Sequence, residues 1–137
     1  MSAERNVETM RRYFELLSRK DIDTWLELWA EDSVQVVPYA GDALPSEIRG
    51  KADRGRLYRG IYDSYEHMRY ADVEIHAVHG AERVFARWHP VGVLRTGEEY
   101  ANESVGLFDF DDEGRIVHCT EWFTPLGFAE SFDVTRT

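Results

Sequence analysis

The chain has 137 residues and a formal net charge of −10, from 26 acidic and 16 basic side chains. This length predicts a single domain over residues 1–137. The acidic balance argues against nucleic acid and anionic membranes as partners, because both require a basic surface. No apolar run approaches the ~18 residues of a membrane-spanning helix. The single cysteine, Cys119, leaves no disulfide framework, so we expect a cytoplasmic protein.

The N-terminal part of the sequence predicts two helices and a strand. Apolar residues recur at three- and four-residue steps over residues 4–19, which is typical of an amphipathic helix. A short second helix begins at Asp21 or Asp23. Its apolar stripe consists of Ile22, Trp25, Leu26 and Trp29, and we interpret the two tryptophans as core residues. Residues 33–39 are rich in β-branched side chains and predict a strand.

A third helix is predicted over residues 52–65, after a loop over residues 41–50 that contains proline and glycine. Its inner face carries Leu57, Tyr58, Ile61, Tyr62 and Tyr65. From residue 70 onward the hydrophobic period changes to two, which predicts strands over residues 70–79, 83–95, 98–110 and 115–124. We therefore expect an α+β fold, in which a strongly curved antiparallel sheet packs against the helices as a cone.

Two glutamates lie on strand faces that are otherwise apolar. Glu121 alternates with Val117, Cys119 and Phe123, and Glu103 alternates with apolar residues of the preceding strand. An unpaired buried carboxylate costs several kcal/mol. Each of these side chains must therefore be paired, be protonated or line a cavity.

The hairpin that joins the two strands decides whether both glutamates point to one side. A three-residue loop would place Glu103 opposite Phe123 and Val105 opposite Glu121, with both carboxylates inside, whereas a four-residue loop would separate them. We expect the first register. In one apolar cup, burial would raise the pKa values of both carboxyl groups, and their like charge would raise one further. The pair would then supply an acid and a base near neutral pH. The alternative is that one of them pairs with an arginine such as Arg87 or lies at a wet rim.

The remaining polar residues narrow the chemistry to proton transfer. His89 lies within a strand beside apolar residues, either as a hydrogen-bonded core or rim residue or as a proton shuttle next to a glutamate. His76 and His79 lie three residues apart on a strand and face opposite ways, so we expect no metal site. The sequence contains no nucleophile motif and no phosphate-binding glycine pattern, so we expect no cofactor.

Five segments carry a family pattern through their order and spacing. They are residues 7–14 (VETMRRYF), 28–34 (LWAEDSV), 48–51 (IRGK), 107–116 (LFDFDDEGRI) and 120–125 (TEWFTP). From residue 6 to about residue 128, the chain resembles the nuclear-transport-factor-2-like superfamily, and within it the SnoaL-like and PhzA/PhzB-like branch.

The resemblance implies a cystatin-like α+β barrel with a deep apolar pocket, and a homodimer that forms through the sheet. It also implies a mostly cofactor-free enzyme: an isomerase, a polyketide cyclase, an epoxide opener or a condensation catalyst. The acid/base glutamate of the PhzA/PhzB-like branch matches Glu121. The position of the histidine on the third helix of that branch falls near Leu57 here, which disfavours condensation. The position of the base in ketosteroid isomerases falls near Val37, which disfavours that reaction. Tyr39 and His89 match a tyrosine and a histidine that assist the carboxylate in SnoaL-like cyclases.

The resulting hypothesis is a cofactor-free cyclase or isomerase of secondary metabolism that acts on a small apolar oxygenated molecule. Ring closure, for instance by epoxide opening, is the expected reaction. Glu121 would move the proton with the help of His89, Tyr39 and Glu103. The pocket would be lined by Leu57, Tyr58, Tyr62, Tyr65, Trp88 and Phe123. The alternatives are a non-catalytic ligand-binding domain and an epoxide hydrolase of the same fold.

Overall fold

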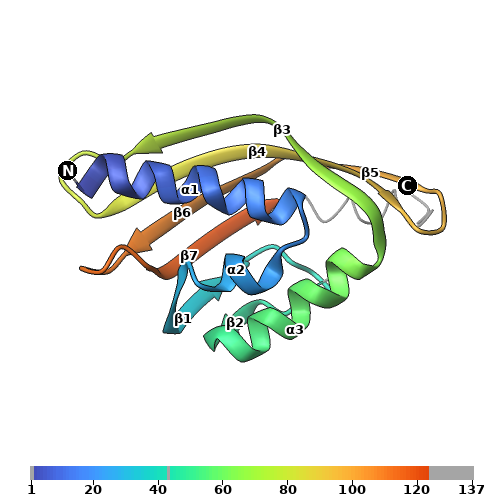
Figure 1. Ribbon diagram of the computed structural model, residues 1–137, viewed down its shortest axis with the longest axis horizontal. Coiled ribbons are helices and arrows are strands. Elements are labelled where there is room, and N and C mark those ends of the chain that lie inside the picture. Colours follow the sequence, from blue (N-terminus) through green and yellow to red (C-terminus); the bar gives the residue numbers. More distant parts are fainter. Residues whose placement is uncertain (1, 43, 124–137) are drawn as a thin grey trace.

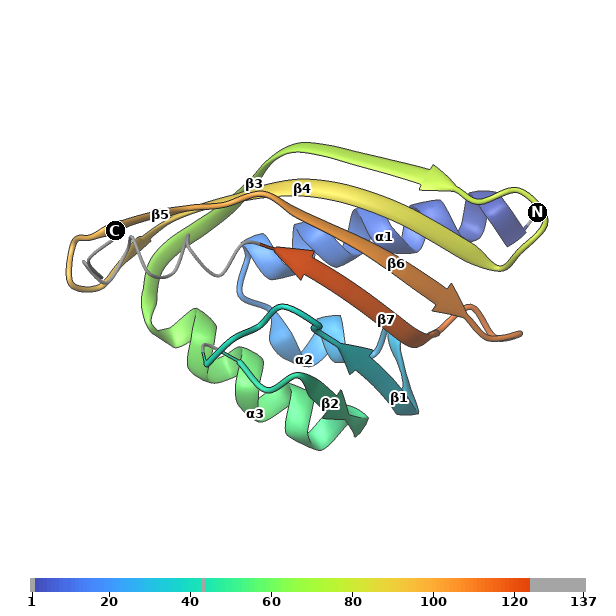
Figure 2. The same ribbon diagram turned by 180° about the vertical axis from the view of Figure 1, so that it is seen from behind.

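The computed structural model describes residues 2–42 and 44–123, which contain three helices and seven strands (Figures 1 and 2). In chain order they are α1 (Ser2–Ser18), α2 (Ile22–Leu26), β1 (Trp29–Val36), β2 (Glu47–Arg49), α3 (Gly50–Asp63), β3 (Tyr65–Ala77), β4 (Arg83–Leu94), β5 (Glu99–Ala101), β6 (Ser104–Phe110) and β7 (Ile116–Phe123). The predicted order is confirmed, with β2 added inside the expected loop.

Three boundaries differ notably from the predicted ones. Tyr65, expected on the third helix, instead begins β3, five residues before the predicted start of that strand. Trp29, expected on the second helix, instead begins β1, where it pairs with Ile116. The strand expected over residues 98–110 is divided into β5 and β6. The break faces Pro90 of β4, whose carbonyl accepts a hydrogen bond from the Asn102 backbone N–H at 3.1 Å. Proline has no N–H to donate in return, so the ladder is interrupted there.

All seven strands form one curved sheet in the order β2–β1–β7–β6–β4–β3, and β5 also pairs with β4. The β1–β7 pair is parallel and the other pairs are antiparallel. Within the described residues, β2 and β3 form the two ends of this path and do not pair with each other. The expected α+β architecture of a curved sheet with N-terminal helices is therefore confirmed, but the sheet is open and not a closed barrel.

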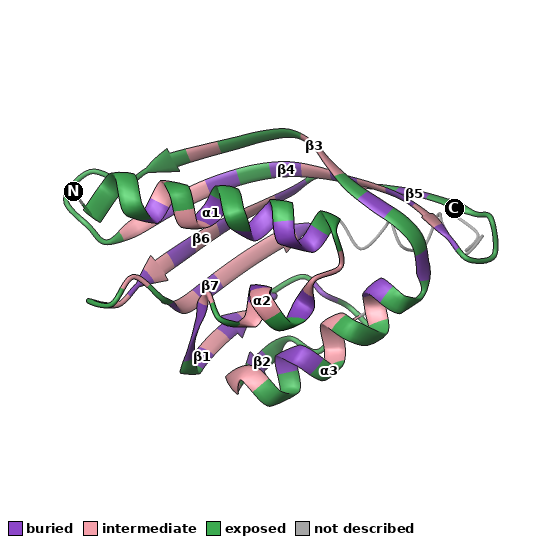
Figure 3. Ribbon diagram, in the orientation of Figure 1, coloured by how far each residue is buried: buried purple, intermediate pink, exposed green. Residues whose placement is uncertain are grey.

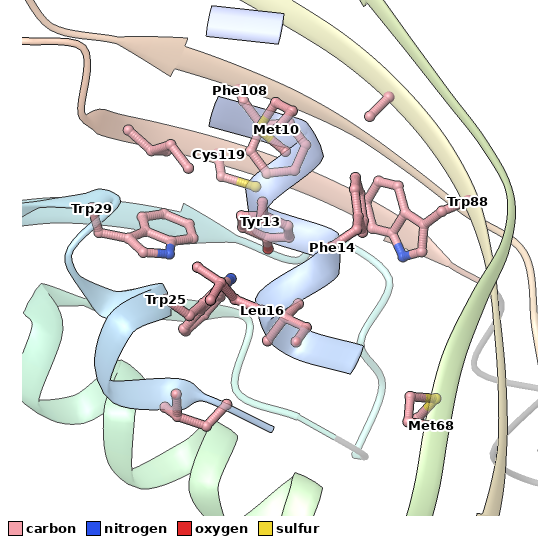
Figure 4. Close-up of a cluster of buried hydrophobic side chains, with 14 of the residues drawn as sticks. Met10, Tyr13, Phe14, Leu16, Trp25, Trp29, Met68, Trp88, Phe108 and Cys119 are labelled. Carbon is pink, nitrogen blue, oxygen red and sulfur yellow. The ribbon is translucent and has the colours of Figure 1, made fainter. Parts of the chain in front are cut away.

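Helix α1 lies across the concave face of the sheet, and its buried stripe forms the centre of the core (Figures 1 and 3). The Tyr13 ring packs edge-on against Phe108, with 5.4 Å between ring centroids, and Phe14 lies 5.0 Å from Trp88 (Figure 4). Aromatic pairs at such separations stabilise a core beyond the area that they bury. The packing of α1 thus fixes one wall of the space between helices and sheet.

Helices α2 and α3 extend this core along the other half of the sheet. The Asp21 carboxylate caps α2 by accepting a hydrogen bond from the Thr24 backbone N–H at 3.2 Å, as expected for an N-cap residue. Trp25 and Trp29 have no exposed surface, which confirms that they are core residues. None of the helices in the described residues combines the length and apolar character that a membrane crossing requires.

The β6–β7 hairpin decides which side chains face the helices. Its turn has the expected three-residue loop, in which the Asp111 N–H donates to the Arg115 carbonyl at 2.9 Å. Beyond the turn, however, Val117 has no partner in β6 and shifts the register by one residue. Glu121 consequently pairs with Gly106 and not with the residue expected to oppose it. A one-residue shift of this kind turns every side chain of one strand to the other face.

Candidate active site

A cavity lies between the concave face of the sheet and helices α1 and α3. The described residues that line it are Tyr13, Leu17, Leu44, Tyr58, Ile61, Tyr62, Tyr65, Met68, Tyr70, Trp88, Pro90, Tyr100, Ser104, Glu121 and Phe123. The centres of water-sized spheres can occupy about 80 Å³ of this space, several times the ~10–15 Å³ that one water molecule needs. The cavity therefore has room for a small ligand.

Glu121 is the only carboxylic acid among these lining residues. It follows Cys119 on the inner face of β7, where alternation along the strand directs its side chain toward the helices. Burial disfavours the charged form and raises the pKa of Glu121 to about 7, although a hydrogen bond from Gln35 opposes this change. At neutral pH both the carboxylate and the carboxylic acid are therefore populated, as an acid/base group requires.

Gln35 of β1 connects Glu121 to a tyrosine of α3. Its amide Nε2 lies 3.3 Å from Glu121 Oε1 and 2.8 Å from the Tyr58 hydroxyl oxygen. Gln35 is itself 1% exposed and does not line the cavity. The amide thus lies behind the cavity wall, between two groups that are part of it.

Arg54 of α3 is fully buried on the other side of Gln35. Its Nε donates to Gln35 Oε1 at 3.1 Å, and its Nη1 donates to Ser33 Oγ at 2.7 Å. Further bonds reach the carbonyls of Ser33, Gly50 and Ile48, and the guanidinium carbon lies 3.8 Å above the Trp29 ring. Burial lowers the pKa of Arg54. No carboxylate in the described part of the chain pairs with this cation, so its hydrogen-bond acceptors are neutral.

The tyrosines of the cavity supply hydroxyl groups to an otherwise apolar wall. Burial raises the pKa of Tyr58, Tyr62 and Tyr70 well above the usual range of a phenol, so all three are protonated at neutral pH. The Tyr62 and Tyr70 hydroxyls are hydrogen-bonded to each other. The Tyr100 hydroxyl accepts a hydrogen bond from Asn102 Nδ2 at 2.9 Å. Such protonated hydroxyls can donate to an oxygen of a bound molecule.

Most of the residues predicted to shape a pocket do line this cavity, namely Tyr58, Tyr62, Tyr65, Trp88 and Phe123. Leu57 does not, and the expectation that it lines the pocket is wrong. It precedes Tyr58 by one residue, which is a rotation of about 100° around a helix, and its side chain is only half-buried.

Glu103 and His89 lie on the outer face of the sheet, away from the cavity. The expectation that Glu103 shares a cup with Glu121 is wrong, because the additional residue Val117 reverses the face that β6 presents. Glu103 Oε2 lies instead 3.5 Å from Arg87 Nη1 and 3.4 Å from His89 Nε2, as the arginine-paired alternative predicted. His89 follows the inward Trp88 on β4, so alternation along the strand directs it outward.

Tyr39 also lies outside the cavity wall, at 65% exposure in the segment after β1. The position suggested by the resemblance therefore does not bring its hydroxyl to Glu121. Thr124 and Pro125, the end of the closing-strand motif, lie outside the described residues.

Sequence reasoning missed Gln35 and Arg54, although both left a signal. Ser33 and Gln35 occupy alternate positions of a β-branched strand and both are buried, a pattern that indicates polar groups facing the core. Arg54 precedes Tyr58 by four residues, which places the two on one face of α3. Buried polar side chains need partners, so the two signals together could have suggested a contact.

The chemistry available in the cavity is that of one acid and several hydroxyls. No lysine, arginine or histidine is among the lining residues that the structure describes. Residues 2–42 and 44–123 also contain no cluster of three or more His, Cys, Asp or Glu side chains that could hold a metal ion. Cys119 is fully buried and burial raises its pKa, which favours an unreactive thiol.

The SnoaL-like domain family matches residues 10–119. The chain belongs to the SnoaL-like family. This SnoaL-like protein is 30% identical over 133 residues to the uncharacterised protein YesE of Bacillus subtilis (strain 168), with 94% of this chain and 88% of YesE covered. Membership of the family that the sequence resembles is thereby confirmed.

Solved structures similar to the SnoaL-like protein include one from Bacillus subtilis that is provisionally named an isomerase. Its TM-score is 0.89 at 26% identity, with 98% of this chain and 97% of that chain covered. A phenazine biosynthesis-related protein from Pseudomonas aeruginosa has a TM-score of 0.86 at 16% identity, covering 99% and 85%. A protein from Xanthomonas campestris pv. campestris, provisionally named a polyketide cyclase, has a TM-score of 0.81 at 23% identity, covering 96% and 98%. The last two establish the fold alone.

Proposed function

We propose that this SnoaL-like protein is a cofactor-free cyclase or isomerase of secondary metabolism that acts by general acid–base catalysis on a small apolar oxygenated molecule. The observation that carries the proposal is Glu121, the single acid in an aromatic cavity, with a pKa raised by burial to about 7. Membership of the SnoaL-like family and the isomerase name of the Bacillus subtilis structure that is 26% identical support the reaction class.

The elementary step is removal of a proton from a carbon next to a carbonyl group. The Glu121 carboxylate takes this proton, the electron pair of the C–H bond forms a C=C bond, and the carbonyl π pair moves onto oxygen. The resulting enolate has two outcomes. If a C=C bond is conjugated with the enolate, Glu121, now a carboxylic acid, returns the proton to the far carbon of that dienolate, which isomerises the molecule. If the same molecule carries a second carbonyl group, the enolate carbon attacks its carbon, the π pair of that C=O moves onto its oxygen and takes the proton from Glu121, and a ring closes.

Hydrogen exchange in an uncharged ketone tests this step without knowledge of the natural substrate. We expect the wild-type protein to accelerate deuterium incorporation at the α-carbon of 2-tetralone in D₂O near neutral pD, as followed by ¹H NMR. The Glu121→Gln variant should lose about 10²–10⁴-fold of that acceleration. No acceleration by the wild type, or equal acceleration by the variant, would contradict the proposal.

Neither alternative function fits the cavity as well. A ligand-binding domain needs apolar walls and one orienting polar group, whereas an enzyme needs several convergent groups that exchange protons or donate hydrogen bonds. Glu121 has no arginine partner among the described residues and lies beside protonated tyrosines. An epoxide hydrolase that uses two carboxylates is disfavoured, because only one carboxylic acid is among the lining residues described.

We also propose that the protein assembles as a homodimer through the outer face of the sheet. Half-buried apolar side chains such as Phe85, Leu107 and Trp122 lie on this face, and helices α1 and α3 pack on the opposite one. The expected result is a dimer in light scattering, and a monomer for Leu107→Lys, because a buried interface disfavours an unpaired charge. A wild-type monomer at micromolar concentration would contradict this assembly.

A further inference from the structure

The orientation of the Gln35 amide is decided by the residue behind it. A guanidinium group carries only hydrogen-bond donors, so the amide atom that faces Arg54 Nε at 3.1 Å has to be the oxygen. The amide NH₂ group consequently faces the cavity side, where Glu121 and Tyr58 lie 3.3 and 2.8 Å from its nitrogen. Arg54, which pairs with no carboxylate among the described residues, thus prevents the amide from turning over.

The two hydrogens of this NH₂ group serve two different acceptors. One is directed to the Glu121 carboxylate and the other to the Tyr58 hydroxyl oxygen. These two oxygens are no more than about 6 Å apart, since each lies about 3 Å from the same nitrogen. Both residues also line the cavity, so a single carbonyl group and its α-carbon fit between the two side chains.

The Tyr58 hydroxyl is therefore available to donate a hydrogen bond. Its oxygen already accepts a hydrogen bond from Gln35, and in residues 2–42 and 44–123 no acceptor is found for its O–H. Its ring is held 4.4 Å from Trp25, measured between centroids. Burial keeps the hydroxyl protonated by raising its pKa. A fixed and protonated donor beside a base is the arrangement that stabilises an enolate oxygen.

We propose that Tyr58 donates the hydrogen bond to the carbonyl oxygen of the substrate, and that Gln35, locked by Arg54, is a positioning residue that holds Tyr58 beside Glu121. The proposal rests on the acid–base function of Glu121 and adds the substrate class, an uncharged carbonyl compound with an α-hydrogen. Tyr58 thereby assists the carboxylate in place of Tyr39 and His89, to which the family resemblance had assigned that help.

The first test measures the positioning residue without any substrate. ¹³C NMR of labelled carboxyl groups follows the pKa of Glu121 in the wild type and in Gln35→Met, a variant of similar volume without the amide. We expect the pKa of Glu121 to rise by about 1 pH unit, because a hydrogen bond to a charged group is lost.

Ser33→Ala is the matched control for this measurement. It also removes a buried hydrogen bond of Arg54 from β1, but leaves the Gln35 amide in place, so the pKa of Glu121 should stay at its wild-type value. An unchanged pKa in Gln35→Met, or an equal rise in Ser33→Ala, would overturn the positioning role of Gln35.

The second test uses the exchange of 2-tetralone hydrogens in D₂O to assess Tyr58. We expect Tyr58→Phe to lower kcat by about 10²–10³-fold, the usual effect of removing one oxyanion donor, with a smaller change in KM. Tyr62→Phe is the comparison, since it removes a hydroxyl one helical turn away that is bonded to Tyr70, and its loss in kcat should be much smaller.

The two proposals fail in different ways. If Glu121→Gln abolishes exchange while Tyr58→Phe keeps the wild-type kcat, the acid–base function stands and the role of Tyr58 is wrong. If Tyr58→Phe and Tyr62→Phe lose kcat equally, the contact with Gln35 gives Tyr58 no special role, and the inference is again overturned.

Discussion

Replacing Glu121 by glutamine should make the native protein more stable than the wild type at pH 8, although Glu121 is the residue to which we assign catalysis. Burial raises the pKa of this carboxyl from its ordinary value of 4.5 to about 7. Between these values the native state retains a proton that the unfolded chain has released. The wild type therefore loses stability as the pH rises through this range. Glutamine has a similar shape and does not titrate.

The size of the effect follows from the displacement of the pKa. A change of about 2.5 pH units, from 4.5 to about 7, corresponds to about 3.5 kcal/mol at about 1.4 kcal/mol per unit. This value is an upper bound, because the Glu121 side chain retains contact with the cavity. The variant should thus match the wild type near pH 4.5 and exceed its free energy of unfolding by up to about 3.5 kcal/mol at pH 8.

Urea denaturation at half-unit steps from pH 4.5 to 8 measures this difference. Glu8→Gln on α1 is the control, since Glu8 is exposed and, among the residues that the structure describes, pairs only with the exposed Arg11. The free energy of unfolding of this control should change with pH as that of the wild type does, and should differ from it by no more than about 1 kcal/mol. Parallel curves for Glu121→Gln and the wild type between pH 5 and 7 would refute the reasoning, because the native carboxyl would then titrate as it does in the unfolded chain.

Three further predictions concern packing and thiol chemistry. Gly106→Ala should lower the free energy of unfolding by about 1–3 kcal/mol, because the new Cβ would lie 2.9 Å from Phe108 and 3.1 Å from Trp88; an unchanged urea midpoint would contradict this. Gly60→Ala should raise that free energy by about 0.5–1 kcal/mol, because Gly60 is an exposed position of α3 where the alanine Cβ meets nothing within 4 Å, and a lowered midpoint would be evidence against it. Cys119 should react with Ellman's reagent only in urea, since it is fully buried; rapid reaction of the native protein would disprove that burial.

Local periodicity was enough to predict the part of the site that depends on a single element. Alternation along β7 identified Glu121 as an acid on an apolar face, and the helical repeat of α3 placed Tyr58 and Tyr62 together. Both inferences require only the side-chain period of one strand or one helix. The register between β6 and β7 depends instead on one additional residue, Val117. This residue is neither a glycine nor a proline, so the sequence does not mark the irregularity. Glu103 was therefore placed on the wrong face.

The contact between Gln35 and Arg54 depends on how two elements pack, and no local pattern determines it. Gln35 is on β1 and Arg54 is on α3, and their bond forms because both side chains enter the same space behind the cavity wall. A polar residue at a buried position indicates that a hydrogen-bond partner exists. The identity of that partner, however, depends on the tertiary arrangement. The two positions suggested by the resemblance lie outside the cavity for reasons of local structure. Tyr39 follows the end of β1 at Val36 and is exposed, and alternation along β4 turns His89 outward.

The charges around the cavity limit what it can bind. The chain carries 26 acidic side chains, yet Glu121 alone is among the lining residues that the structure describes, and no lysine, arginine or histidine accompanies it there. The buried cation Arg54 is separated from the cavity by Gln35. A carboxylate or phosphate on the substrate would meet an acid and aromatic rings with only hydroxyl donors to offset its desolvation. Anionic substrates are thus disfavoured, and an uncharged ketone, whose enolate forms only after binding, is the ligand that these walls suit best.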